Sequence, residues 1–195
     1  MAEMYPIFLK LEGRPVLVVG AGKVALRKVE ALQEAGAKTT VIAPEVCDQL
    51  RRHAEDGKLS LHERPWQPAD CAGALLVVAA TGNAELNAQI REAAHLAGAL
   101  VNAVDDPDNC DFYVPAVARR GDLRVAVSTQ GAAPLIASRV RRHLEKTLPA
   151  ELADVIESVS VERERLLASG LTEQARLRRL RAFLDAELER WGLKL

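Results

Sequence analysis

This chain of 195 residues has few aromatic residues, almost no net charge and no long apolar run. Phe, Trp and Tyr together make up 4% of it, which argues against the base stacking that recognition of single-stranded nucleic acid requires. The formal net charge is −1, so no overall field favours nucleic acid or a membrane surface. No apolar run approaches the roughly 20 residues that cross a bilayer, and the first ten residues lack the design of a signal peptide. We therefore expect a cytoplasmic protein that has neither nucleic acid nor a membrane as a partner.

Cysteine and histidine are also few. The three cysteines (Cys47, Cys71 and Cys110) and the four histidines are widely spaced and show no metal-ligand pattern. This usage predicts reduced thiols and no metal site. The hydrophobic content of 49% is, by contrast, enough to build a genuine core.

The most informative stretch runs from Val16 to Lys28, with the sequence VLVVGAGKVALRK. An apolar, valine-rich strand leads directly into Gly20-Ala-Gly22 and then into a helical pattern. Gly20 allows a sharp turn, and Gly22 lets the backbone approach a pyrophosphate. The following helix N-terminus offers N–H groups and a positive dipole end to the phosphates. The pattern favours a dinucleotide site, and the alternative is a bare glycine turn in an α/β domain.

Strand-like and helix-like segments alternate over the first half of the chain. Strands are expected at 16–19, 39–43, 58–63, 75–80 and 100–104, and helices at 24–35, 46–54 and 84–97. This alternation predicts an α/β fold, a NAD-binding Rossmann domain with a doubly wound parallel sheet.

The pattern changes after Cys110. Two strands are expected at 112–117 and 123–128, followed by a helix at 135–147 and by charge-balanced helices from 150 onward, with Thr172 as an N-cap. We predict a Rossmann domain at 1–113, a small α+β dimerisation segment at 114–149 and a C-terminal helical domain at 150–195. Dimerisation is inferred because two strands are too few to close a core alone.

Carboxylates follow two of the expected strands. Glu45 lies shortly after the second strand, where an acidic residue binds ribose hydroxyls, and no arginine stands there to receive a 2′-phosphate. NAD is therefore favoured over NADP, although a solvated loop glutamate is an equal alternative. Asp105 and Asp106 follow the last strand, where one of them can act as a general acid or base beside a nicotinamide. The position favours Asp105 for this role and a turn role for Asp106, before Pro107.

The segment from Arg119 to Lys146 is basic, with a local net charge of +5. Arg139 and Arg142 can share one helix face, which with Arg119 and Arg120 would attract a polyanionic small molecule. The alternative is a solvated helix face. Ser128 ends a strand and either lines the pocket or belongs to a turn.

Several motifs occur together in a fixed order: Pro6-Ile-Phe-Leu-Lys-Leu, VVGAGKVALRK, Asn102-Ala-Val-Asp105-Asp-Pro, Phe112-x-x-Pro115-Ala and Val125-Ala-Val-Ser-Thr-x-Gly131-x-x-Pro134. With them the chain resembles the precorrin-2 dehydrogenase and sirohydrochlorin ferrochelatase family, the N-terminal module of siroheme synthases. The resemblance covers about residues 5–149. The chain is similar to the stand-alone members, because it ends where fused enzymes continue into a methyltransferase.

The resemblance implies a homodimer that oxidises precorrin-2 to sirohydrochlorin with NAD. It implies that Asp105 is the functional aspartate and that NAD is contacted by Gly22, Lys23, Val24, Pro44, Glu45 and the Thr81 region. The eight carboxylates of the tetrapyrrole substrate would explain the basic segment. Two alternatives stay open. In the first, the enzyme is bifunctional and also inserts Fe²⁺ into sirohydrochlorin, with Asp105 serving both reactions. In the second, the chain is a non-catalytic NAD-sensing module.

Overall fold

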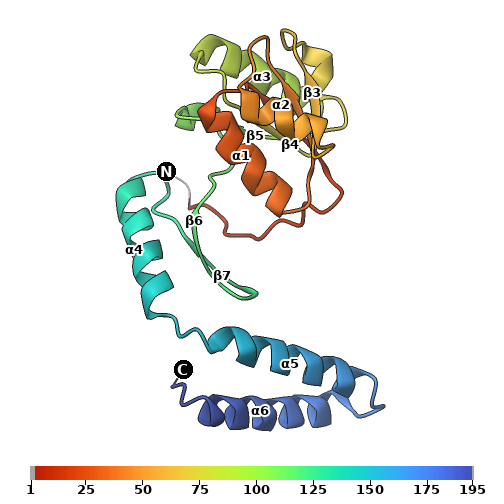
Figure 1. Cartoon of the computed structure of the whole chain (residues 1–195), viewed down its shortest axis with the longest axis vertical. Coiled ribbons are helices and arrows are strands. Elements are labelled where there is room, and N and C mark those ends of the chain that lie inside the picture. Colours follow the sequence, from red (N-terminus) through yellow and green to blue (C-terminus); the bar gives the residue numbers. More distant parts are fainter. Residues whose placement is uncertain (1–2, 195) are drawn as a thin grey trace. The chain divides into compact units, whose positions relative to one another are not determined.

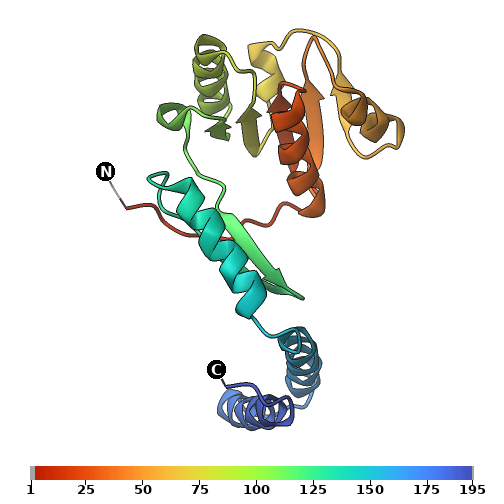
Figure 2. The same cartoon turned by 60° about the vertical axis from the view of Figure 1, so that its left-hand side comes forward.

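The computed structural model describes residues 3–194, and the chain divides after Tyr113 into two compact units. The first unit is a parallel sheet with helices on both faces, and the second combines a two-stranded hairpin with three helices (Figures 1 and 2). Among the described residues, no helix is both long enough and apolar enough to span a membrane.

The sheet of the first unit has five parallel strands in the order β3-β2-β1-β4-β5. Its strands are β1 (Pro15–Val19), β2 (Lys38–Ile42), β3 (Ser60–His62), β4 (Leu76–Ala79) and β5 (Leu100–Ala103). The helices of this unit are α1 (Lys23–Glu34), α2 (Asp48–Glu55) and α3 (Ala84–Leu96), with short 3₁₀ turns η1 (Pro68–Cys71) and η2 (Pro107–Asn109). The chain adds strands on one side of β1 and then crosses to the other side, so the strand order reverses between β1 and β4.

The core of this unit lies on both faces of the sheet. Leu17 and Val19 of β1 pack with Ile90 of α3 on one face, and Val18 packs with Val29 of α1 and Leu50 of α2 on the other. Because both faces are covered, β1 and β4 consist of continuous apolar residues rather than an alternating pattern. The fold class predicted from the sequence is therefore confirmed.

The second unit begins with the hairpin of β6 (Ala116–Arg120) and β7 (Leu123–Val127), which packs against α4 (Pro134–Thr147). Two further helices, α5 (Leu152–Leu167) and α6 (Glu173–Arg190), lie side by side (Figure 1). They are joined through the buried carboxylate of Glu187, which accepts a 2.9 Å hydrogen bond from the Ser158 hydroxyl. The hydrogen bond from Ser158 is the largest of the causes that lower the pKa of Glu187, and the nearby Arg190 lowers this pKa further. The Thr172 hydroxyl caps α6, as predicted, by accepting from the Ala175 N–H.

Several predicted element ends are wrong by a few residues, among them those of the strand expected at 58–63, which spans Ser60–His62. The strand expected from 112 begins only at Ala116, because Pro115 has no N–H to donate to a ladder. The helix expected from 46 begins at Asp48, after Cys47 in extended conformation. Arg119 and Arg120 belong to β6 rather than to the connecting turn, since they pair with Arg124 and Leu123. The predicted boundary between 149 and 150 stays a prediction.

Gly20 offers a direct test of how the sheet is assembled. Its φ is +105°, and an added Cβ would lie 2.3 Å from the Ala80 carbonyl oxygen at the end of β4. Gly57 also has a positive φ, of +70°, but an added Cβ there would meet nothing within 4 Å. We expect Gly57→Ala to lower the free energy of unfolding by about 1–2 kcal/mol through the backbone penalty alone. Gly20→Ala should lose roughly 1–3 kcal/mol more through the overlap, measured by urea unfolding, and equal losses in the two variants would contradict this account.

Candidate functional site

The glycine turn lies where the strand order reverses. Gly20 N–H donates to the Ile42 carbonyl of β2 over 2.9 Å, and Ala80 N–H donates to the Val19 carbonyl of β1 over 2.8 Å. The carboxyl ends of three neighbouring strands are thus bonded to one another around Gly20. In open α/β sheets this reversal point is the place where ligands bind.

The N-terminus of α1 fits an anionic phosphate group. Its N-cap is Gly22, which supplies no side-chain cap, and the first turn of the helix contains no acidic residue. The N–H groups of that turn have no partner within the helix and carry the positive end of the helix dipole. An added Cβ on Gly22 would meet nothing within 4 Å, so the space above this backbone is open. Lys23 and Val24, the first residues of α1, are exposed and half-buried respectively. The start of α1 therefore has the open backbone and the positive dipole end that a phosphate group requires, and its role in cofactor binding stays a prediction.

The other predicted cofactor contacts surround this turn. Pro44 and Glu45 are exposed immediately after β2, and Thr81 is half-buried after β4. The Thr81 hydroxyl donates to Asn87 Oδ1 over 2.7 Å and accepts from Asn83 N–H, so it organises the start of α3. The roles of all three residues in cofactor binding stay predictions.

Asp105 follows β5 in an unusual backbone conformation. Its φ is +59°, and of the non-glycine residues described only Gln130 shares a positive φ. Asp and Asn are the side chains that tolerate this left-handed region best. The turn is fixed from both sides, because Val104 N–H donates to the Ala79 carbonyl of β4 and Asp106 N–H contacts the Ala103 carbonyl. The Asp105 side chain is exposed at the same sheet edge as the glycine turn.

Asp106 has the turn role that the sequence offered as its alternative. Its carboxylate accepts a 2.7 Å bond from the side-chain amide of Asn109, across the short helix η2 that Asp106 begins. This contact occupies Asp106 and leaves Asp105 as the exposed carboxylate of the pair.

Sequence reasoning missed a polar contact between α1 and β5. Asn102 is only 6% exposed although it lies within β5, and its amide nitrogen donates to the Phe112 carbonyl over 2.9 Å. Its oxygen lies 3.5 Å from Nζ of Lys28, a half-buried lysine of α1. Burial lowers the pKa of Lys28, whereas Cys110 and Asp105 act in the opposite direction. A single asparagine inside an apolar strand was the available signal for this contact.

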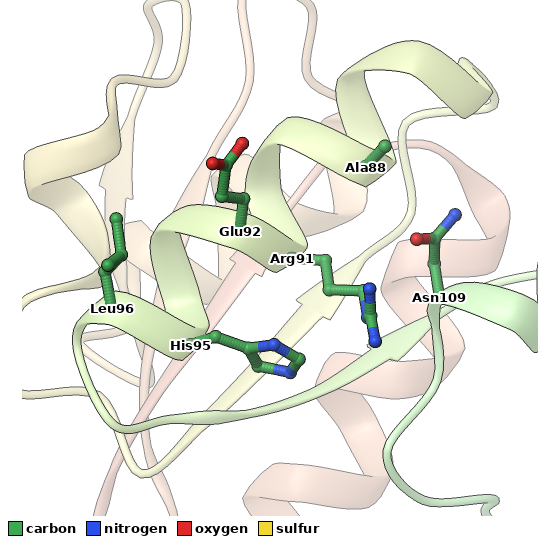
Figure 3. A pocket seen from close by; sticks show the side chains of 6 residues that line it. All are labelled: Ala88, Arg91, Glu92, His95, Leu96 and Asn109. Atoms are coloured by element: carbon green, nitrogen blue, oxygen red, sulfur yellow. The ribbon is translucent and has the colours of Figure 1, made fainter.

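The segment after η2 is tied to α3 by an aspartate. Asp111 accepts a 2.8 Å bond from Val101 N–H of β5 and another of 2.8 Å from Nε2 of His95. Beside it is an open hollow of about 470 Å³, into which Arg91, His95 and Asn109 point (Figure 3). None of the residues predicted for the site lines this hollow, which lies along α3 and away from the glycine turn.

The predicted substrate residues belong to the second unit and do not share one face. Arg119 is exposed on β6, whereas the neighbouring Arg120 is half-buried on the opposite side and donates to the Glu145 carbonyl of α4. The Ser128 hydroxyl accepts from Gln130 N–H, which is a turn contact. Arg139 and Arg142 are both exposed, three residues apart on α4. The binding of substrate by these residues stays a prediction.

Comparison with protein families decides what kind of chain this is. The family described as putative NAD(P)-binding matches residues 7–116, more than half of the chain. The chain belongs to this family. A second family, described as sirohaem biosynthesis protein central, matches residues 120–147. The cofactor class is thus a nicotinamide dinucleotide, and the resemblance found in the motifs is confirmed.

Similar proteins agree with the two family matches. The chain is 43% identical over 148 residues to a siroheme synthase of Methylobacillus flagellatus and 44% identical over 155 residues to siroheme synthase 2 of Aeromonas salmonicida. The matched regions span 76% and 80% of this chain, but only 32% of the length of each relative. A solved structure titled SirC, precorrin-2 dehydrogenase, superposes on this chain with a TM-score of 0.78 at 24% sequence identity. The match covers 96% of this chain and 98% of the solved one. This last likeness establishes the fold.

A substitution at Gly22 tests cofactor binding without disturbing the fold. Its φ of −85° suits any residue, and an added methyl group would meet no protein atom within 4 Å. We expect Gly22→Ala to keep the melting temperature of the wild type but to weaken binding of the dinucleotide at least about tenfold, because the methyl group occupies the space of the pyrophosphate. Isothermal titration calorimetry with NAD⁺ and NADP⁺ measures the affinity, and unchanged affinity for both would contradict the cradle.

Proposed function

We propose that this chain oxidises precorrin-2 to sirohydrochlorin in siroheme biosynthesis, with NAD as the hydride acceptor and Asp105 as the proton-handling residue. The observation that carries this proposal is the exposed, left-handed Asp105 at the same sheet edge as a helix N-terminus that fits a pyrophosphate. The siroheme synthase relatives and the fold shared with a precorrin-2 dehydrogenase support it.

Oxidation of the substrate removes a hydride and a proton. Bound NAD supplies the hydride acceptor, and the N–H groups at the start of α1 hold its phosphates at the end of β1. The Asp105 carboxylate takes the proton from the substrate as the hydride departs, which is general base catalysis. Its turn is bonded to the ends of β4 and β5, so the backbone of Asp105 is held at the sheet edge.

The surroundings of β2 favour NAD over NADP. Glu45 is exposed just beyond this strand, where a carboxylate accepts hydrogen bonds from ribose hydroxyls and repels a 2′-phosphate. The nearby Arg51 of α2 is engaged in a two-pronged contact with Glu63 at 2.9 and 2.8 Å. It is therefore occupied by a carboxylate rather than available to a phosphate.

The second unit supports a homodimer that binds a polyanionic substrate. Leu135 of α4 is 86% exposed and Ile136 is 59% exposed, on a helix that packs against β6 and β7. A second copy of the chain would cover this apolar surface and complete the small sheet. Arg139 and Arg142, both exposed on α4, would then bind carboxylates of the tetrapyrrole, together with Arg119 of β6. The free thiols are consistent with a cytoplasmic location.

Asp105→Asn tests the catalytic assignment. Asparagine keeps the left-handed backbone and nearly the same shape but cannot accept a proton as a carboxylate does. We expect kcat for NADH formation from precorrin-2 to fall about 10²–10⁴-fold, with unchanged melting temperature and NAD affinity. Asp106→Asn is the matched control, because an asparagine oxygen can still accept the bond from Asn109, and its kcat should stay close to that of the wild type. A fully active Asp105→Asn variant would remove Asp105 from the mechanism.

Leu135→Asp tests the dimer. A charge in the exposed apolar surface of α4 should shift the mass measured by light scattering from that of a dimer to that of a monomer, because its desolvation opposes association. Asp122→Asn, in the hairpin turn, provides a surface change that should leave the dimer intact. A monomeric wild-type protein at micromolar concentration would contradict this part of the proposal.

A further inference from the structure

The thiol of Cys110 lies against the turn that carries Asp105. Its Sγ donates to the Ala103 carbonyl over 3.0 Å and lies 3.3 Å from the Asp106 carbonyl oxygen, so one S–H group is shared between two acceptors. These carbonyls belong to residues on either side of Asp105. The Cys110 side chain is half-buried, and the thiol is free of any disulfide. The sulfur therefore bridges the two ends of the turn.

The backbone alone closes this turn weakly. Val104 N–H donates to the Ala79 carbonyl over 2.8 Å, which fixes the start of the turn to β4. The bond across the turn, from Asp106 N–H to the Ala103 carbonyl, is 3.4 Å long, whereas such bonds are usually about 2.9–3.0 Å. The left-handed φ of +59° at Asp105 is unfavourable for a residue with a Cβ and persists only where surrounding contacts fix it. The contacts of the thiol supply a second closure across the same residues.

The buried Asn102 of β5 orients the thiol. Its amide nitrogen donates to the Phe112 carbonyl over 2.9 Å and lies 3.5 Å from Cys110 Sγ. An amide donor on the sulfur leaves the S–H group to point toward the carbonyls. The backbone next to Cys110 is also tied to the sheet, because Asp111 N–H donates to the Val101 carbonyl over 2.8 Å. The sulfur is thus held from β5 and from the chain that follows the turn.

The surroundings of the thiol keep it a hydrogen-bond donor. Burial has the largest effect and raises the pKa of Cys110, and the carboxylates of Asp106 and Asp111 raise it further. The contact with the Ala103 carbonyl and the charge of Lys28 act in the opposite direction without cancelling this increase. The thiol is therefore protonated at neutral pH, which is the only form that can donate.

We propose that Cys110 is a positioning residue for Asp105, because its Asn102-oriented S–H group holds Ala103 and Asp106 in the turn that presents the Asp105 carboxylate to the substrate. The inference rests on the proposed function of Asp105. It gives the thiol a role in the reaction that involves no redox or nucleophilic chemistry.

Three substitutions at Cys110 test this role by kinetics. Cys110→Ala removes the donor and should lower kcat for NADH formation from precorrin-2 about 10–10²-fold, as expected for a misplaced catalytic group. Cys110→Val refills the space without a donor and should lose as much as the alanine variant. Cys110→Ser restores a donor of similar shape and should retain most of the wild-type kcat. Affinity for NAD should be the same in all three variants.

Cys71→Ala is the matched control, since Cys71 is fully buried in the core beside η1 and makes no contact with the turn. It should lower the melting temperature by leaving a cavity and should leave kcat unchanged. Wild-type kcat in Cys110→Ala, or a serine variant as impaired as the alanine variant, would overturn the proposal.

NMR of the folded protein tests the turn without turnover. The coupling between the amide and α protons of Asp105, together with its ¹³C shifts, reports its φ. We expect left-handed values in the wild type and in Cys110→Ser, and a shift toward ordinary negative φ in Cys110→Ala and Cys110→Val. Unchanged values in the last two variants would overturn the inference whether or not precorrin-2 is oxidised. Shifted values in a protein whose wild type does not oxidise precorrin-2 would support the role of the thiol in the turn and contradict the proposed function alone.

Discussion

The close approach of Gly20 to the Ala80 carbonyl is the constraint on which the rest of the first unit depends. β1 and β4 are neighbours in the sheet although about sixty residues separate them in the chain, and they meet at full contact only if position 20 has no side chain. From this point the chain leaves β1 toward α1 on one face and leaves β4 toward α3 on the other. In open α/β sheets ligands bind where two such connections diverge, and everything proposed for the cofactor follows from this divergence.

Several polar residues near this edge have backbone conformations or environments that are unfavourable for their residue types. Asp105 adopts a left-handed backbone, Asn102 interrupts an apolar strand, and Lys28 is half-buried with its ammonium 3.5 Å from Asn102 Oδ1. Each departure costs stability, and the apolar packing on both faces of the sheet offsets it. Such departures gather at functional sites because catalysis requires groups in conformations and environments that folding alone would not select.

The architecture could be predicted from the sequence because it depends on local patterns: apolar runs for covered strands, alternating with segments of helical spacing. Asp105 and Glu45 could be found because the ends of parallel strands lie at one edge of the sheet. The contact of Lys28 with Asn102 could not, since it joins residues 74 positions apart and depends on how far α1 extends over β5. The two arginines of β6 show a different limit. Counting charges along the chain ignores the alternation of a strand, which sends adjacent side chains to opposite faces.

Gly20 and Gly22 are two residues apart, yet different requirements act on them. Position 20 is restricted by the protein's own backbone, so a change there is eliminated when the chain folds, whatever the protein does afterwards. At position 22 an added Cβ would meet no protein atom within 4 Å, so a restriction there would come from the cofactor that we propose to bind above it. In a lineage that had lost the cofactor, position 22 would be free to accumulate side chains while position 20 stayed glycine. Comparison of positions 20 and 22 among related sequences would therefore show whether dinucleotide binding is still under selection.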